Sequence, residues 1–306
     1  MRPTEWKTIA WNGVRFAVPG DWEPGRIGRR HLLFESEPGP VMEIKWGAVK
    51  GRFSRPRQLR ELSRRIDRKR SAFQERALSG EWRTSLSGFE AAGFQWDAAN
   101  ERAEGVLLYC SACRTASLIQ FFDRPETANI ECNASRILAS FRDHRSDGRV
   151  AWALYDIVAL LPDSFVLERH RFEAGRFVLE FSGRRGRLAL YRWAPAGVLL
   201  QKRSLADFAE THAGGTGLEF HGLTIAGHPA VEGRDPAPVG WAARLKTRLR
   251  IASFRRLRLW HVADRNRMLG VRLEGRRPID DSEMCALSDA YGMDDEKACA
   301  VLADPG

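Results

Sequence analysis

The sequence of 306 residues has no long apolar run, which excludes a membrane-spanning helix. Such a helix needs about 20 consecutive apolar residues. The longest apolar stretch, residues 150–162, is interrupted by Asp156 and ends at Pro162. Residues 1–13 also lack the charged-then-apolar pattern of a signal peptide. We therefore expect a cytoplasmic protein without a membrane span.

Cysteine is scarce as well, and the familiar catalytic motifs are absent. Five cysteines, an odd number, fit reduced thiols better than a disulfide framework. The sequence has no G-x-S-x-G and no H-E-x-x-H, and the glycine-rich residues 212–217 lack the Lys-Ser/Thr of a P-loop. Nothing in the sequence fixes a catalytic constellation, so we favour a protein that is not an enzyme.

The composition is that of a globular protein with a basic surface. Hydrophobic residues make up 43% and charged residues 29%, and the length suits two domains. The net charge is +10, with 42 Arg and only 7 Lys. An arginine excess can reflect GC-rich codon use, or it can mark a surface that binds an acidic partner.

An internal repeat organises the chain. Residues 13–46 and 155–193 both contain an apolar strand that ends at proline, an aromatic residue three positions later, and a final strand that ends in tryptophan. The matched residues are Pro19 and Pro162, Trp22 and Phe165, and Trp46 and Trp193. Further along, a hairpin recurs in which Tyr109 aligns with Trp260, Cys110 with His261, and Cys113 with Asp264.

Helix candidates follow the strands in both halves. They cover residues 56–77 and 127–141 in the first half, and residues 204–212 and 280–293 in the second. Ser204 is the expected N-cap of the third helix, with Asp207 three residues later. Short turns between alternating strands favour antiparallel pairing. We therefore predict an α+β fold with two tandem copies of a twisted antiparallel sheet flanked by helices.

The predicted domain boundary lies in a polar, turn-rich segment, residues 141–152. This gives domains 1–144 and 145–306. The strand–Pro–x–x–aromatic openings, the strands that end in tryptophan and the hairpin before a terminal helix resemble the PsbP/DcrB-like family, an α/β/α sandwich. The resemblance implies a protein that binds or supports other proteins rather than an enzyme.

The pair Cys110 and Cys113 forms a C-x-x-C between two predicted strands. Two thiolates at this spacing can bind one zinc ion, with Cys132 as a third ligand and a His or Asp from elsewhere as the fourth. A redox pair would need the motif at a helix N-terminus, which a hairpin does not supply. Cysteine also packs as a small hydrophobic residue, so metal binding, redox chemistry and simple packing all stay open.

Two basic surfaces are predicted. One is the polar face of the first helix, and the other is a pair of strands with alternating arginines. Their residues are Arg57, Arg60, Arg64, Arg65 and Arg68 on the helix, and Arg244, Lys246, Arg248, Arg250, Arg256 and Arg258 on the strands. The leading hypothesis is docking of an acidic protein surface. Nucleic acid is the alternative partner, although no known nucleic-acid motif is present.

Overall fold

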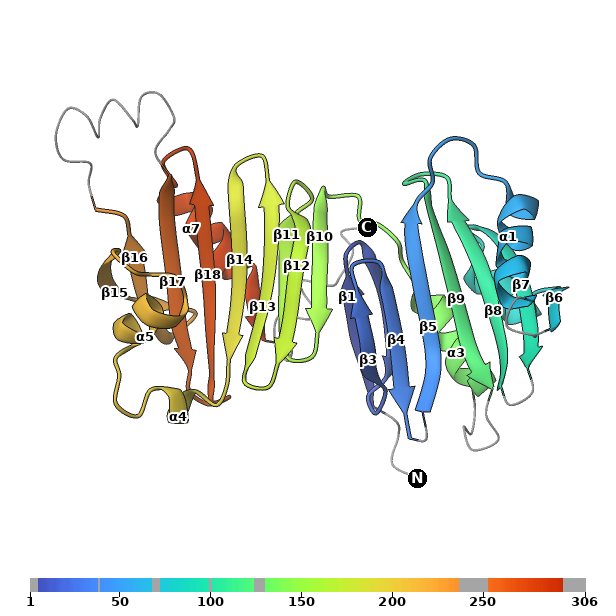
Figure 1. The fold of residues 1–306 in the computed structure, drawn as a ribbon, viewed down its shortest axis with the longest axis horizontal. Helices are drawn as coiled ribbons and strands as arrows, with labels where there is room; N and C mark the ends of the chain where they lie inside the picture. Colours follow the sequence, from blue (N-terminus) through green and yellow to red (C-terminus); the bar gives the residue numbers. More distant parts are fainter. Residues whose placement is uncertain are drawn as a thin grey trace. The chain divides into compact units, whose positions relative to one another are not determined.

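The computed structural model describes residues 5–37, 39–67, 72–98, 101–123, 130–236 and 253–293. The chain forms two compact units, residues 1–146 and residues 147–306 (Figure 1). No helix within the described ranges is long and apolar enough to cross a membrane.

The first unit contains one seven-stranded antiparallel sheet, with strand order β3-β4-β5-β9-β8-β7-β6, and a separate β1–β2 hairpin. The strands are β1 (Trp6–Trp11), β2 (Val14–Pro19), β3 (Glu23–Gly28), β4 (His31–Ser36), β5 (Gly39–Ala48), β6 (Ala72–Arg76), β7 (Glu90–Ala98), β8 (Glu101–Cys110) and β9 (Thr115–Asp123). The helices are α1 (Arg55–Asp67), α2 (Gly80–Ser85) and α3 (Ile130–Ser140).

Helices cover both faces of this sheet, as neighbouring residues of β9 show. Phe121 contacts Trp82 of α2, with ring centroids 5.9 Å apart. Phe122 belongs instead to a cluster on the opposite face, where Leu62 and Ile66 of α1 pack. Successive side chains of a strand point to opposite faces, so the unit has the layers helix, sheet and helix.

The second unit repeats this arrangement. Its seven-stranded antiparallel sheet has the order β12-β13-β14-β18-β17-β16-β15, and β10, β11 and β19 pair separately. The strands are β10 (Arg149–Leu154), β11 (Ile157–Pro162), β12 (Val166–Glu173), β13 (Arg176–Gly183), β14 (Gly186–Trp193), β15 (Glu219–Ile225), β16 (His228–Arg234), β17 (Phe254–Val262), β18 (Arg267–Gly275) and β19 (Tyr291–Met293). The helices are α4 (Ala196–Leu199), α5 (Leu205–His212) and α7 (Asp281–Asp289).

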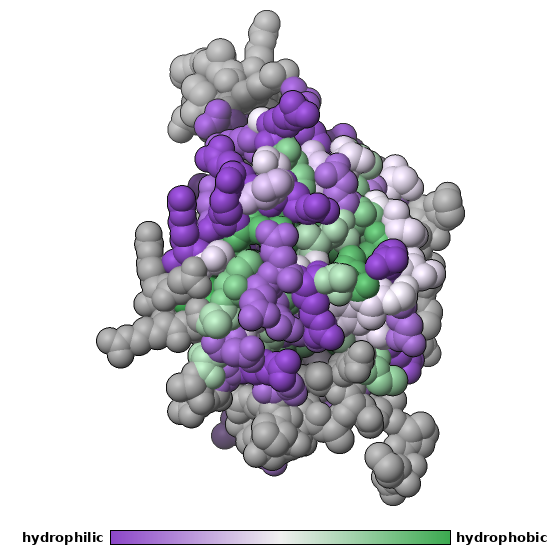
Figure 2. Space-filling view, turned by 90° about the vertical axis from the view of Figure 1, so that its right-hand side faces the viewer, coloured by the Kyte–Doolittle hydropathy of each residue, from purple (hydrophilic) through white to green (hydrophobic). Residues whose placement is uncertain are grey.

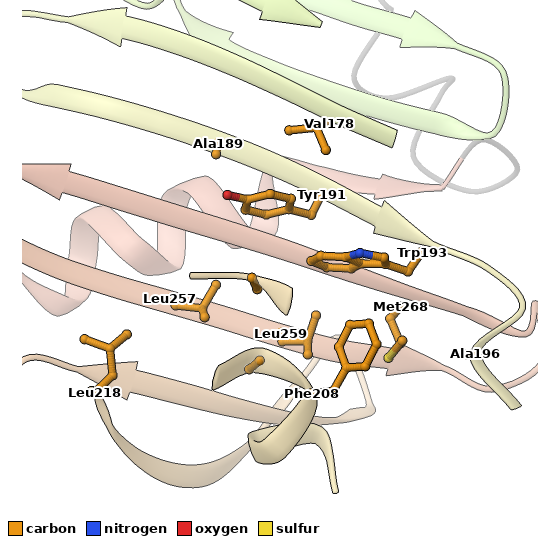
Figure 3. Packing of buried hydrophobic residues seen from close by; sticks show 12 residues of the cluster. Val178, Ala189, Tyr191, Trp193, Ala196, Phe208, Leu218, Leu257, Leu259 and Met268 are labelled. Atoms are coloured by element: carbon orange, nitrogen blue, oxygen red, sulfur yellow. The ribbon is translucent and has the colours of Figure 1, made fainter. Parts of the chain in front are cut away.

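The core between α5 and the second sheet is aromatic. Figure 3 shows Trp193 of β14 beside Phe208 of α5; their rings meet edge to face with centroids 5.3 Å apart. The same buried cluster also contains Leu257, Leu259 and Met268. On the other face of this sheet, Trp260 packs against Tyr291, with ring centroids 5.8 Å apart.

Both sheets have the same strand order, because each strand of the first sheet corresponds to the strand nine places later in the chain. The predicted α+β class with antiparallel sheets and helices is confirmed. The unit boundary falls after Ser146, two residues beyond the expected position.

Three predicted elements need correction. The helix expected over residues 56–77 ends at Asp67, and Phe73 lies instead on β6, where it pairs with Trp96. Phe73 joins the same apolar cluster as Leu62 and Ile66, so its helical spacing reflects a shared core and not a shared helix. The helix expected over residues 280–293 ends at Asp289, and β19 follows. The predicted linker also overlaps β10, which begins at Arg149.

Candidate metal centre

Four side chains of the first unit bring metal-binding atoms together. Cys110, Cys113, Asp143 and His144 each offer one donor atom, and these atoms all lie within 4.8 Å of one another. In a tetrahedral zinc site with Zn–S bonds of about 2.3 Å, two sulfur ligands lie about 3.8 Å apart. The four donors therefore need to move only a short distance to reach zinc-binding geometry.

The two cysteines lie at the tip of the β8–β9 hairpin. Cys110 is the last residue of β8, pairs with Thr115 and is buried. Cys113 lies in the turn and is followed by Arg114, whose φ of 57° is in the left-handed region. Arg114 also fixes the turn to the chain after β5, because its carbonyl accepts a hydrogen bond from Val49 N–H and its guanidinium donates one to the Gly51 carbonyl, both at 2.8 Å.

The other two donors follow α3. Phe141 is fully buried and packs against Phe16, with ring centroids 6.4 Å apart. Arg142 then forms two backbone hydrogen bonds of 2.8 Å with Arg15 of β2. These contacts fix the chain immediately before Asp143, so the donor pair is held by buried packing and backbone pairing, not by a loose linker.

Hydrogen bonds already connect the four groups. The Cys113 thiol donates to Asp143 Oδ2 at 3.1 Å, and Asp143 Oδ1 lies 2.8 Å from His144 Nδ1. Cys110 Sγ lies 3.8 Å from the same His144 nitrogen. The side chain of Asp143 is only 3% exposed, whereas that of His144 is 44% exposed. A buried carboxylate is costly unless a positive group compensates it, and a bound cation would do so.

The environment also bears on the redox alternative. Burial, together with the hydrogen bond and negative charge of Asp143, raises the pKa of the Cys113 thiol to about 12. A redox-active cysteine needs a lowered pKa, and the hairpin tip supplies no helix N-terminus. The hairpin therefore disfavours a thioredoxin-like pair, and a metal ion would bind here only by displacing the thiol proton of Cys113.

Cys132, the predicted third ligand, is not part of this cluster. It is exposed on α3, and the third and fourth donors are Asp143 and His144. The sequence predicts a His or Asp from elsewhere as the fourth ligand, but it places residues 143 and 144 in the linker. The adjacent Asp-His pair directly after the α3 segment was the available signal.

The described residues at the equivalent positions of the second unit are not metal donors. Cys110 and Val262 are both the last paired residues of their strands, and Arg114 and Asn266 are the left-handed residues that end the two turns. Cys110 therefore corresponds to Val262. The alignment with His261 was shifted by one residue, which moves a strand side chain to the opposite face.

The same correspondence gives the partners of the other donors. Cys113 corresponds to Arg265 and not to Asp264. On the helix side, Arg142 pairs with Arg15 as Gly292 pairs with Val158, so Asp143 corresponds to Met293. The four-donor arrangement thus occurs at this hairpin in the first unit, and its described counterparts in the second unit are not a donor set.

The predicted basic residues are only partly brought together. Arg57, Arg60 and Arg64 are exposed on α1. The side chain of Arg65 and the residues Arg68, Arg244, Lys246, Arg248 and Arg250 lie outside the described part of the structure.

Arg256 and Arg258 do not form the predicted exposed basic face. They are 5% and 6% exposed, on the face of the second sheet that α7 covers. Both donate to the carboxylate of Glu232, which is 1% exposed and also accepts from Arg234. Both guanidinium groups are buried and paired with Glu232. In this structure they are therefore not part of a surface that could dock a partner.

Comparisons with known proteins give limited similarity. No protein-family model and no curated protein matches the chain. The structure of the Ran-binding protein Mog1p from Saccharomyces cerevisiae is similar over 46% of this chain and 96% of its own, with 7% identity and a TM-score of 0.32. A structure from Bacteroides thetaiotaomicron is similar over 52% of this chain and 53% of its own, with 13% identity and a TM-score of 0.30. Similarity at this level carries no functional conclusion.

Proposed function

We propose that the protein is a non-enzymatic accessory module whose first unit binds one zinc ion through Cys110, Cys113, Asp143 and His144. The observation that carries this proposal is the convergence of the four donor atoms within 4.8 Å. Thiolate, imidazole and carboxylate are the ligands that zinc takes in proteins. The site would lie in a reducing compartment such as the cytoplasm, where thiols stay available for metal.

The donor count favours a structural role for the metal. Four protein ligands fill a tetrahedral shell, whereas catalytic zinc sites keep one position for water or substrate. The ligands come from the β8–β9 hairpin and from the chain just after α3. A zinc ion would therefore join two segments that are about 30 residues apart in sequence, and its binding energy would add to the stability of the first unit.

The proposal also includes an internal duplication in which one copy has a metal site. The shared strand order of the two sheets supports it. The equivalent hairpin of the second unit has Val262 and Arg265 at the cysteine positions, and Met293 at the position of Asp143. The duplicated module keeps the fold in both copies while the ligand set is present in the first.

The test is the zinc content of protein purified without chelator or immobilised metal. We expect about one zinc per chain, and Cys110→Ala/Cys113→Ala should reduce it to background. Asp143→Ala and His144→Ala should each weaken zinc binding by at least about tenfold, as measured by competition with a chromophoric chelator.

Cys132→Ala is the matched control, because this cysteine is exposed and lies outside the donor cluster. It should leave zinc content unchanged. Cobalt substitution gives an independent check, since two thiolate ligands in a tetrahedral site produce intense visible and near-ultraviolet absorption. Failure of the folded wild-type protein to bind zinc or cobalt would overturn the proposal.

A further inference from the structure

A groove lies between α1 and the uncovered part of the first sheet. It has a volume of about 540 Å³ and is lined by α1, by the end of β5 with the chain after it, and by β8 and β9. Figure 2 shows the side of the molecule on which α1 lies in Figure 1; among its coloured residues, hydrophobic areas show between hydrophilic ones. This groove is separate from the four metal donors.

Small and apolar residues form the floor of the groove. Gly47 of β5 pairs with Ala116 of β9, and this pair of small residues leaves a hollow on the sheet. Leu107 and Leu118, which pair across β8 and β9, and Leu62 of α1 surround it. The helix packs toward β6 at the edge of the sheet, so it leaves this part of the face uncovered.

Basic side chains form the rim. The groove is lined by four basic residues, Lys45, Lys50, Arg52 and Arg57, and by one acidic residue, Glu61. Glu61 is already paired with Arg57 at 3.1 Å. Lys50 and Arg52 are exposed and have no ion-pair partner among the described residues.

Additional positive charge surrounds this rim. The guanidinium of Arg30 reaches Gly47, with Nη1 3.8 Å from the position that a Cβ on this glycine would occupy. On α1, Arg60 and Arg64 are exposed. Two of the four basic residues in the lining already have acidic partners, Arg57 with Glu61 and Lys45 with Glu43. The unpaired charges of Lys50 and Arg52 beside an apolar floor complement a chain that alternates apolar and acidic side chains.

We propose that this groove binds an acidic segment of a partner protein, with apolar side chains on the floor and carboxylates against Lys50 and Arg52. A peptide fits the lining better than a nucleic acid. Single-stranded nucleic acids bind by stacking bases on accessible aromatic rings. Trp46, the aromatic residue among those that line the groove, is 8% exposed, and its indole donates to the Asn12 carbonyl at 3.0 Å.

The test is fluorescence anisotropy of the full-length protein with a labelled peptide in which glutamate alternates with leucine. A second peptide has glutamine in place of glutamate. We expect the acidic peptide to bind at least about tenfold more tightly, and its affinity to fall steeply with added salt. Equal affinity for the two peptides, or no binding of the acidic one, would overturn the proposal.

Two variants locate the binding site. Lys50→Glu/Arg52→Glu should weaken binding of the acidic peptide by about tenfold or more. Ala116→Leu should also weaken it, because the added side chain fills the hollow without changing charge. The matched control is Arg276→Glu/Arg277→Glu, which makes the same charge change at exposed arginines of the second unit and should reduce binding far less.

The remaining outcomes are also decisive. An equal loss in the control variant would show non-specific attraction and refute the groove. Displacement of the peptide by a single-stranded oligonucleotide of higher affinity would assign the surface to nucleic acid and refute the peptide proposal. Zinc content, measured on the same samples, should stay unchanged in all groove variants, so failure here is distinguishable from failure of the metal site.

Discussion

The carboxylate of Glu232 on β16 pairs with two buried arginines. It lies opposite Arg258 in the strand pairing of the second sheet, and its oxygens accept from Arg258 and Arg256. Arg256 also donates to the Ile279 carbonyl at 3.0 Å. A buried ion cluster of this kind persists only while all its members are present, because removal of one partner leaves a buried charge uncompensated.

Glu232→Gln should therefore destabilise the protein by about 3–5 kcal/mol. Urea unfolding followed by circular dichroism measures this loss. The control is Glu219→Gln, since Glu219 is exposed on β15, and a change there should stay within about 0.5 kcal/mol. Similar midpoints for the two variants would show that the cluster contributes little to stability.

The pKa of Glu232 gives a pH dependence. Burial by itself raises this pKa, but hydrogen bonds from Arg258, Arg256 and Arg234 outweigh it and lower the value from 4.5 to about 2. A lowered pKa in the folded state means that the stabilisation is complete above about pH 4.5 and is lost as the pH falls toward 2. Wild type should lose stability over this range more steeply than Glu232→Gln.

At the scale of elements, the start of α5 is set by a local interaction. Ser204 Oγ accepts from Asp207 N–H at 3.1 Å, and Asp207 Oδ2 accepts from Ser204 N–H at 3.0 Å. This capping box satisfies donors that the first turn of a helix leaves open. The helix then holds Phe208 in the aromatic core against Trp193.

Ser204→Ala should lower the free energy of unfolding by about 1 kcal/mol, the usual cost of losing an N-cap. Thermal or urea denaturation measures it. Lys202→Ala, an exposed change two residues earlier, should have little effect. A loss as small in Ser204→Ala as in the control would mean that core packing alone fixes the start of α5.

The capping box could be predicted from sequence because both partners lie within one turn. The ligand pair Asp143 and His144 could not be assigned in the same way, because their distance from Cys110 depends on how α3 packs and on the pairing of Arg142 with Arg15. The burial of Arg256 and Arg258 could not be predicted either, because it also depends on tertiary packing. Strand alternation predicted that they share a face, but only the tertiary structure shows that α7 covers this face.

The repeated hairpin shows a further limit of sequence comparison. Its existence in both units was predictable from apolar alternation around a turn. The register was not, because a shift of one residue keeps the composition similar and yet exchanges the two faces of a strand. The matched Trp46 and Trp193 illustrate this, since Trp46 donates to Asn12 in the β1–β2 turn, whereas Trp193 packs against α5.

At the scale of the whole molecule, two sheets of one topology differ in their chemistry at equivalent hairpins. We expect the chain to take up one zinc ion and not two when it is titrated with zinc. His261→Ala/Asp264→Ala should leave this stoichiometry unchanged, because neither residue occupies a position equivalent to a cysteine ligand. Isothermal titration calorimetry against apo protein measures the count, and a second site lost in this variant would contradict the assignment.

The two hydrogen bonds that connect Arg114 to Val49 and Gly51 have a thermodynamic consequence. They join the turn that carries Cys113 to the chain segment that carries Lys50, at the rim of the groove. If a metal ion orders the turn, the groove loses less conformational entropy when a peptide binds. By linkage, zinc and peptide would then increase each other's affinity by the same factor. The peptide affinity of the first unit would therefore rise with zinc concentration.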